Sequence, residues 1–225
     1  MTKVIGLYLH GFLSSGNSAK GQWFKSQSLT EYTNESGSFL DWVTPTYPIG
    51  SVALSVSTIR QALEGQLERA EAYEKTSGEA CKVVLLGSSM GGFYAQYFAY
   101  EYGLPFVMIN PALNPKQVFI ENMGVHINPA TDETVEINAD YINQVLGFQI
   151  NLAERGMKNS SPKSLLLLDL DDEIIDVQYA LQYYPISKVG DDNSVNKTVT
   201  FTGGDHSFIH LEQAWEEILK FIKYV

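Results

Sequence analysis

The chain has 225 residues, of which 44% are hydrophobic and only 18% are charged, against a usual charged share of about 25%. This composition excludes a disordered chain and predicts one compact domain over residues 1–225. The formal net charge is −11, from 26 acidic and 15 basic residues, so we expect neither nucleic acid nor an anionic membrane surface as a partner.

Cysteine content and apolar run lengths bear on the compartment. Cys81 is the single cysteine, so it cannot form an intramolecular disulfide, and nothing points to an oxidising compartment. The N-terminal apolar run is too short for a signal peptide, and no run has the length of a membrane span. We therefore expect a cytoplasmic protein.

The first apolar run, residues 4–9, predicts a buried strand. It leads directly into His10-Gly11-Phe12. Gly11 allows a turn that points the Phe12 amide inward, because glycine adopts backbone conformations closed to other residues. We expect the His10 side chain to be structural and to hold this loop by hydrogen bonds.

A weaker strand is predicted at 40–43, and a helix follows it. From Val52 the apolar residues recur at steps of three and four, which is typical of a helix with one buried face. These positions are Val52, Val56, Ile59, Leu63, Leu67, Ala70 and Tyr73.

The third run, 83–86, precedes the segment GSSMGG at 87–92 and a predicted helix at 93–102. A strand, a Gly-x-Ser-x-Gly turn and a helix form the context of a nucleophile elbow, which exposes a serine on a sharp turn. Ser89 is the serine in that position. The alternatives are a glycine-rich turn without chemistry and a phosphate loop. A Walker-type loop is disfavoured because no lysine follows the glycines, and a dinucleotide site is disfavoured by position and glycine spacing.

A fourth strand is predicted at 106–109, and the segment 111–162 after it is too long for a plain connection. It carries a helical pattern at 141–152 and a turn at Asn128-Pro129. We interpret it as a cap-like insertion over the carboxyl edge of the sheet. The alternative is a peripheral helix with a long loop.

The fifth strand, 165–168, is followed by a group of carboxylates: Asp169, Asp171, Asp172, Glu173 and Asp176. We expect Asp169 at the strand end and Asp176 one turn into a helix at 174–184. Asp171 or Asp172 would lie on the loop between them. The sequence pattern leaves open which of these carboxylates could orient a histidine.

The sixth strand, 199–201, leads into GGDHSF at 203–208. A histidine on a turn at a strand end can serve as a general base, so His206 is the candidate. His126 and His210 are weaker candidates, because the first lies in the insertion and the second lies one turn into the last helix. That helix is predicted from an apolar face, with Ser207 as its N-cap. Its apolar positions are Phe208, Leu211, Trp215, Ile218 and Ile222.

Strands and helices that alternate in this way predict a doubly wound α/β sheet of about six mostly parallel strands, with helices on both faces. The chain order is Ser89, then the carboxylates, then His206, which is the order of α/β-hydrolases. We therefore predict a serine hydrolase whose oxyanion hole is formed by the amides of Phe12 and Met90. No residue spacing suggests a metal or a cofactor, so we expect neither.

Five segments together resemble the YqiA/YcfP-type (UPF0227) family of small bacterial esterases. They are LYLHGFLSSGNSAK at 7–20, GSSMGGFYA at 87–95, LPFVMINPALNP at 104–115, DDEIIDVQYA at 171–180 and GGDHSF at 203–208. The resemblance implies an α/β-hydrolase fold without the first strands of larger members. It also implies carboxylesterase activity on small short-chain acyl esters. It favours Asp172 as the acid, although Asp171 stands where the family usually has glycine.

Other functions use the same residues. A thioesterase or an amidase would need the same Ser89, Asp172 and His206, and a binding protein could retain the fold without activity. The segment 124–137 resembles the family only loosely, so no substrate preference is carried over to it. The physiological substrate and the oligomeric state stay open at this point.

Overall fold

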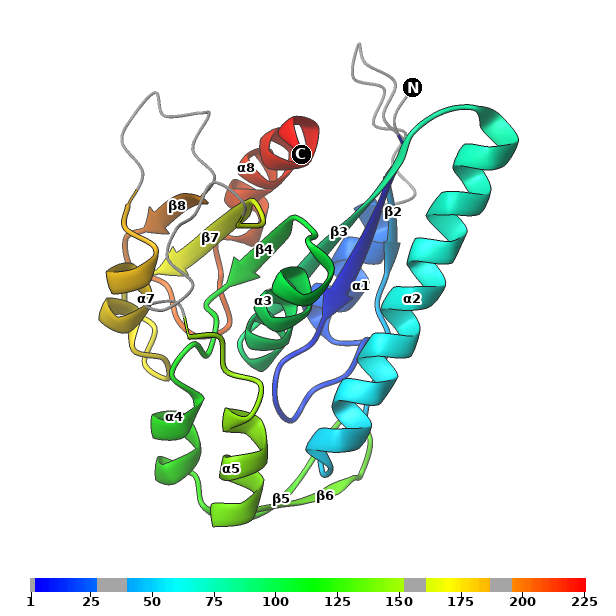
Figure 1. Cartoon of the computed structure of the whole chain (residues 1–225). Coiled ribbons are helices and arrows are strands. Elements are labelled where there is room, and N and C mark those ends of the chain that lie inside the picture. Colours follow the sequence, from blue (N-terminus) through cyan, green and yellow to red (C-terminus); the bar gives the residue numbers. More distant parts are fainter. Residues whose placement is uncertain (1–2, 28–39, 152–160, 187–195) are drawn as a thin grey trace.

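The computed structural model describes residues 3–27, 40–151, 161–186 and 196–225. Its main sheet has six strands: β1 Lys3–Leu9, β2 Leu40–Val43, β3 Cys81–Ser88, β4 Phe106–Ile109, β7 Ser164–Asp169 and β8 Asn196–Phe201. They run in the order β2-β1-β3-β4-β7-β8, and every neighbouring pair is parallel (Figure 1). This is the predicted α/β sheet, with each predicted strand in place.

The apolar strands are explained by burial on both faces of the sheet. On β3, Val83 and Leu85 belong to the core cluster on one face, and Val84 and Leu86 belong to the cluster on the other. Side chains alternate along a strand, so a strand covered on both sides must be apolar at every position. All four of these side chains are at most 4% exposed.

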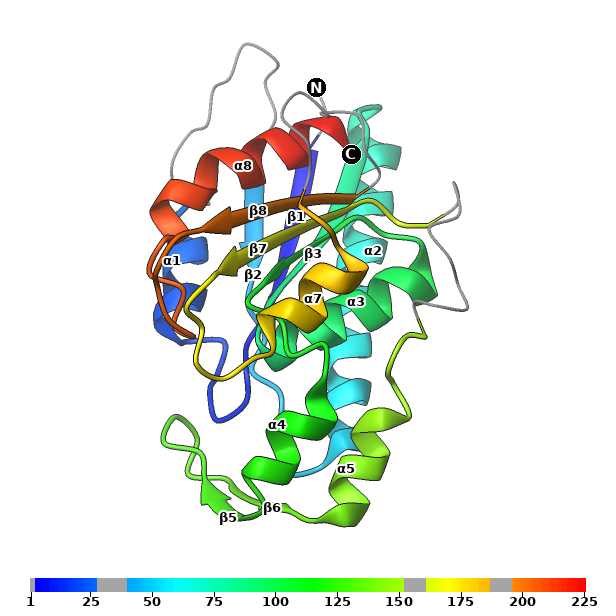
Figure 2. The same ribbon diagram turned by 90° about the vertical axis from the view of Figure 1, so that its left-hand side faces the viewer.

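Helices cover the two faces (Figures 1 and 2). Helices α2 Val52–Ser77, α3 Met90–Tyr102 and α7 Val177–Tyr183 pack on one face, and α1 Ala19–Gln27 and α8 Leu211–Tyr224 pack on the other. The predicted apolar face of α2 contributes Val52, Val56, Ile59, Leu63 and Ala70 to the core. Helix α1 was not expected from the sequence, because its contact with the sheet depends mainly on the aromatic residues Trp23 and Phe24.

Residues 115–146 of the segment 111–162 lie beyond the carboxyl ends of the strands (Figure 2). Its described part contains α4 Pro115–Glu121, the antiparallel pair β5 Gly124–Ile127 and β6 Thr134–Ile137, and α5 Ala139–Leu146. The predicted helix at 141–152 begins earlier, because Asn138 caps α5 by accepting a 3.0 Å hydrogen bond from the Tyr141 amide, and it ends at Leu146, before Gly147. Leu152 lies outside the described residues. The predicted turn at Asn128-Pro129 is present and joins β5 to β6, but the sequence analysis predicted neither these two strands nor α4.

The last helix starts later than predicted. Its N-cap is His210, so the prediction of Ser207 as the cap was wrong. The reason is Phe208, whose φ of 57° is incompatible with a helix and whose buried ring contacts Phe201. The first residues of the apolar pattern thus form a turn that packs against β8.

Helix α7 also starts later than predicted. Its first residue is Val177, because the Asp176 carboxylate caps the helix by accepting a 2.9 Å hydrogen bond from the Tyr179 amide. Asp176 therefore precedes the helix instead of lying one turn inside it. The residues between β7 and α7 form a turn.

Cys81, the single cysteine, is a buried free thiol at the start of β3. Of the helices in the described ranges, none combines the length and the hydropathy needed to cross a membrane.

Candidate active site

Ser89 lies on the turn between β3 and α3. Its backbone angles are φ 56° and ψ −122°, a conformation that residues other than glycine rarely adopt. The Ser89 amide donates a 3.0 Å hydrogen bond to the carbonyl of Ile109, and the Ser89 carbonyl accepts bonds of 2.9 Å from Gly92 and 3.1 Å from Ala112. These bonds connect the strained turn to the end of β4.

The glycines around Ser89 are required by close backbone contacts. A Cβ atom at Gly87 would lie 2.0 Å from the carbonyl oxygen of Gly91, and one at Gly91 would lie 2.0 Å from that of Leu9. Any side chain at either position would push α3 away from β1 and β3. The pattern Gly-x-Ser-x-Gly thus follows from the steric needs of the turn.

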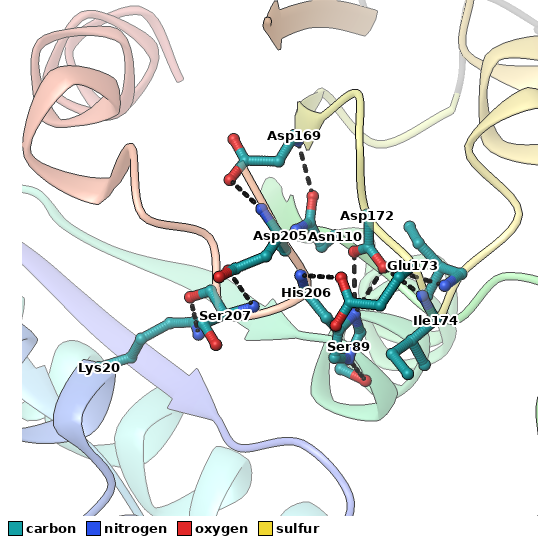
Figure 3. A network of polar contacts seen from close by, with 11 residues as sticks. Lys20, Ser89, Asn110, Asp169, Asp172, Glu173, Ile174, Asp205, His206 and Ser207 are labelled. Carbon is teal, nitrogen blue, oxygen red and sulfur yellow. Dashed lines mark hydrogen bonds and ion pairs between the residues drawn. The ribbon is translucent and has the colours of Figure 1, made fainter. Parts of the chain in front are cut away.

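His206 connects Ser89 to a buried carboxylate (Figure 3). Its Nε2 lies 2.9 Å from Ser89 Oγ, and its Nδ1 lies 2.9 Å and 3.1 Å from the two carboxylate oxygens of Asp172. The Asp172 side chain is fully buried, and its Oδ1 also accepts hydrogen bonds from the amides of Ile174 and Ile175 at 2.8 Å and 3.0 Å. Asp172 is therefore fixed in position, and the His206 ring is oriented by it.

The other candidates lie elsewhere. Asp171 is exposed, and its amide donates to the carbonyl of Gly203 at 3.3 Å. Glu173 accepts a 3.1 Å hydrogen bond from the His206 amide and so holds the loop, not the ring. His126 lies on β5, with its Nε2 2.8 Å from the Asn122 carbonyl. Of the two loop carboxylates, the structure brings Asp172 to His206.

A second histidine–carboxylate pair supports the His206 loop. Asp169, at the end of β7, is fully buried, and its Oδ1 lies 2.6 Å from Nδ1 of His210. Its Oδ2 accepts a 3.3 Å hydrogen bond from the Asp205 amide. Asn110 joins the network, since its Nδ2 donates to the Asp205 carbonyl at 2.9 Å and its Oδ1 accepts from the Asp169 amide at 2.9 Å (Figure 3). Sequence reasoning missed Asn110, although a polar residue directly after the apolar β4 was a visible signal.

His10 is structural in its contacts. Its ring is fully buried and stacks on Tyr47 with a centroid distance of 3.9 Å. Its Nδ1 donates to the Gly11 carbonyl at 2.9 Å, and its Nε2 accepts from the Tyr47 amide at 3.3 Å. Burial lowers the pKa of His10 to about 4, so the ring is neutral near pH 7.

The loop after β1 lies against Ser89. A Cβ atom at Gly11 would be 3.2 Å from Ser89 Cβ and 3.7 Å from Ser89 Oγ. The neighbouring Phe12 ring packs edge-on against Phe119, at a centroid distance of 5.3 Å, and so joins this loop to the segment 111–162. Met90, the residue after Ser89, begins α3. Both residues expected to supply oxyanion amides therefore flank Ser89.

A cavity of about 360 Å³ opens beside Ser89 and His206. The lining residues come from the loop after β1, from the start of α1, from the turn after β3 and from the His206 loop. Lys20 is among them, and sequence reasoning had not singled it out. Across the described ranges, no group of three or more His, Cys, Asp or Glu side chains is arranged to hold a metal ion.

Solved structures share this fold at low sequence identity. Est1E from Butyrivibrio proteoclasticus superposes with a TM-score of 0.65 and 15% identity, covering 99% of this chain and 88% of that one. A structure described under the metagenome-derived lipolytic enzymes LipS and LipT gives 0.62 and 15%, covering 100% and 94%. The esterase EaEST from Exiguobacterium antarcticum gives 0.55 and 14%, covering 98% and 91%. These similarities show an α/β-hydrolase fold.

A family model assigns the chain more narrowly. The model described as "Uncharacterised protein family (UPF0227)" matches residues 5–223, which is nearly the whole sequence. The expected resemblance to this family is thereby confirmed. The chain belongs to the UPF0227 family and has the α/β-hydrolase fold.

Proposed function

We propose that the chain is a serine esterase that cleaves short-chain acyl esters. Ser89 would be the nucleophile, His206 the general base and Asp172 the group that orients His206. The observation that carries this proposal is the continuous hydrogen-bonded line from Ser89 Oγ through both ring nitrogens of His206 to the buried Asp172 carboxylate. Ser–His–Asp arrangements of this geometry activate a serine hydroxyl for acyl transfer.

Acylation follows from the positions of these atoms. Ser89 Oγ attacks the ester carbonyl while Nε2 of His206, 2.9 Å away, takes the hydroxyl proton. Asp172 holds the proton on Nδ1 of His206, so Nε2 is the free base. Asp172 also stabilises the imidazolium that forms when Nε2 takes the proton. His206 then gives its proton to the leaving alcohol, and the acyl group remains on Ser89. Water then attacks the acyl group while Nε2 of His206 takes a proton from it. His206 returns this proton to Ser89 Oγ, and the carboxylic acid is released.

The negative charge that develops on the carbonyl oxygen needs donors placed beforehand. The amides of Phe12 and Met90 fill this role in the proposal. Met90 is the first residue of α3, where free amides and the helix dipole favour an anion. The close approach of Gly11 to Ser89, and the place of Phe12 in the lining of the same cavity, support the Phe12 amide as the second donor.

The size of the cavity supports a small substrate. Its volume of about 360 Å³ lies near the lower end of the range of small-molecule sites, roughly 300–1,000 Å³. The neighbouring structures described as lipolytic enzymes and as an esterase support an ester as the bond that is cleaved. A thioester or an amide would require the same residues, so the type of bond needs a direct comparison.

The decisive experiment is covalent trapping with a fluorophosphonate probe followed by peptide mapping. Ser88 and Ser89 lie in one peptide, so the site must be assigned by fragmentation and by two variants. We expect Ser89→Ala to abolish labelling and Ser88→Ala to retain it. Label at another residue would refute the proposal, as would wild-type protein that stays unlabelled. Matched oxygen ester, thioester and amide substrates then identify the bond type.

A further inference from the structure

The cavity beside Ser89 contains one ammonium group. Lys20 lines it, and no aspartate or glutamate is among its lining residues in the described part of the chain. This local positive charge contrasts with the net charge of −11. Any group bound next to Ser89 therefore meets a cation, although the protein as a whole repels anions.

Lys20 lies in the first turn of α1, where the helix dipole disfavours a cation. Burial lowers its pKa from 10.5, and the charges of Asp205, Asp169 and Asp172 act in the opposite direction. Its Nζ donates a 2.6 Å hydrogen bond to the Ser207 carbonyl, the one acceptor that the described residues provide (Figure 3). An ammonium has three N–H donors, so two remain for a ligand.

The nearby carboxylates do not compete for these donors from within the cavity. The side chains of Asp172 and Asp169 are fully buried, and each is held by a histidine. Asp205 accepts a 2.8 Å hydrogen bond from the Ser207 amide. None of the three aspartates lines the cavity, and their charges oppose the lowering of the Lys20 pKa by burial.

Neutral hydroxyl groups complete the lining. Tyr8, Ser14, Ser18 and Ser88 all contribute to the cavity. Burial raises the pKa of Tyr8 far above its usual value, so its hydroxyl stays protonated, and side-chain hydrogen bonds connect it to Ser18 and Ser88. A lysine that shares a cavity with hydroxyl groups suits the oxygen atoms of an anion, because charge-assisted hydrogen bonds are stronger than neutral ones.

We propose that the ester cleaved at Ser89 carries an anionic group, a carboxylate or a phosphate, and that Lys20 binds this group. This inference rests on the proposed esterase function and narrows its substrate class. The small cavity places the anion only a few bonds from the scissile carbonyl. The preferred substrates are then monoesters of short dicarboxylic acids or short acyl esters of a phosphorylated alcohol.

The test compares each charged ester with a neutral analogue of the same shape. Monomethyl succinate is paired with methyl succinamate, in which an amide replaces the carboxylate. Butyryl glycerol phosphate is paired with monobutyrin, which lacks the phosphate. The measured quantity is the ratio of kcat/KM for the charged member to that for the neutral member. The pair with the larger ratio identifies the anion.

Variants of Lys20 test the cause of this preference. In wild type we expect a ratio of about ten or more for one pair, the usual strength of a hydrogen bond to a charged group. Lys20→Met should lower that ratio to near one, and Lys20→Arg should keep part of it. Loss of the Ser207 contact alone would slow both members of a pair equally and leave the ratio unchanged.

Lys25 provides the matched control. It lies on α1 outside the cavity lining, with its Nζ 3.2 Å from the side-chain oxygen of Asn17. Lys25→Met removes the same charge from the same helix, so the substrate ratio should stay at the wild-type value. Equal effects of the two Met variants would show that total charge, not Lys20, sets the preference, and would overturn the inference.

Other outcomes separate this inference from the proposed function. Ratios near one for both pairs, with the neutral esters turned over, would overturn the role of Lys20 and leave the esterase intact. Absence of both turnover and Ser89 labelling would overturn the esterase proposal itself. If the probe labels Ser89 but no ester is turned over, competition between the esters and the probe decides. The inference is supported if the charged esters slow labelling of wild type, the neutral esters do not, and Lys20→Met loses this protection. Equal protection by the charged and neutral esters refutes it.

Discussion

Nδ1 of His210 lies 2.6 Å from the buried carboxylate of Asp169, directly behind the loop that carries His206. The pair of His210 and Asp169 thus lies next to the pair of His206 and Asp172. Asp169 also contacts the backbone of the loop that carries His206. Through the Asp205 amide, Asp169 fixes the residue that precedes His206. We regard Asp169 as a positioning residue.

Asp169→Asn tests this role. The amide can accept only part of the hydrogen bonds of the carboxylate and loses the charge beside His210. The free energy of unfolding should fall by roughly 1–3 kcal/mol, the cost of weakening a buried polar network. Urea denaturation measures the fall, and kcat should decrease while KM changes little. The exposed neighbour is the control, and Asp171→Asn should stay within about 0.5 kcal/mol of wild type. Identical curves for the two variants would contradict the role.

Asp172→Asn tests the choice of acid. If the proposed roles hold, replacement of the carboxylate leaves His206 in the wrong tautomer, so kcat should fall by roughly 10⁴-fold, the loss expected in a serine triad. Asp171→Asn should retain activity within about twofold, because surface substitutions away from the site have small effects. The rates are measured with a short-chain ester near neutral pH. A large loss in Asp171→Asn with little in Asp172→Asn would reverse the assignment.

Two adjacent glycines give a paired test of the His206 loop. Gly203 and Gly204 have φ values of +78° and +83°, but only at Gly204 would a Cβ atom collide, at 2.0 Å from Asp169 Oδ2. Gly203→Ala should cost roughly 1–2 kcal/mol of stability from backbone strain. Gly204→Ala should cost roughly 1–3 kcal/mol more, because it displaces the buried carboxylate. Thermal and urea unfolding of both variants provide the comparison, and equal losses would show that the steric contact is relieved cheaply.

His10 should make the protein acid-sensitive in a defined window. Burial lowers its pKa to about 4 in the folded state, from about 6.5 in the unfolded chain. The unfolded state therefore binds a proton first, and stability falls as the pH drops from about 6.5 to about 4. The loss from this group is roughly 3 kcal/mol and ends below the folded pKa.

His10→Gln removes this titration and keeps a hydrogen-bond acceptor for the Tyr47 amide. The variant should be less stable than wild type near neutral pH, but its stability should fall less steeply on acidification. Urea unfolding between about pH 7 and pH 4.5 measures both slopes. Parallel slopes would mean that the His10 ring is not held neutral in the folded protein.

The sequence predicted those parts of the structure that depend on local geometry. Apolar runs identified the strands because a sheet covered on both faces needs them at every position. The spacing of Gly87 and Gly91 identified the turn at Ser89, since no other residue fits there. The residue pattern alone did not separate Asp172 from Asp171, and only the family resemblance favoured Asp172. In the structure Asp172 is buried against His206, whereas Asp171 is exposed.

Features that depend on contacts between distant segments could not be predicted from the sequence. Phe208 continues the apolar spacing of the last helix, yet packing against Phe201 holds it in a turn. Lys20 belongs to a helix without a clear amphipathic pattern, and its place beside Ser89 comes from the path of the loop after β1. The role of Asn110 depends on its hydrogen bonds with Asp169 and Asp205, which lie far along the chain.

Hydrogen bonds connect the hairpin of β5 and β6 to the loop after β1 and to the segment before α2. Asn128 is fully buried and donates a 2.9 Å hydrogen bond to the Ser14 carbonyl, and Glu133 accepts bonds of 2.9 Å and 2.8 Å from the amides of Ile49 and Gly50. The Phe12 ring packs against the same segment. The hairpin is therefore not an independent module in this fold. Replacement of this segment by a foreign one would also disturb the loop that faces Ser89, so such a graft must retain Asn128 and Glu133.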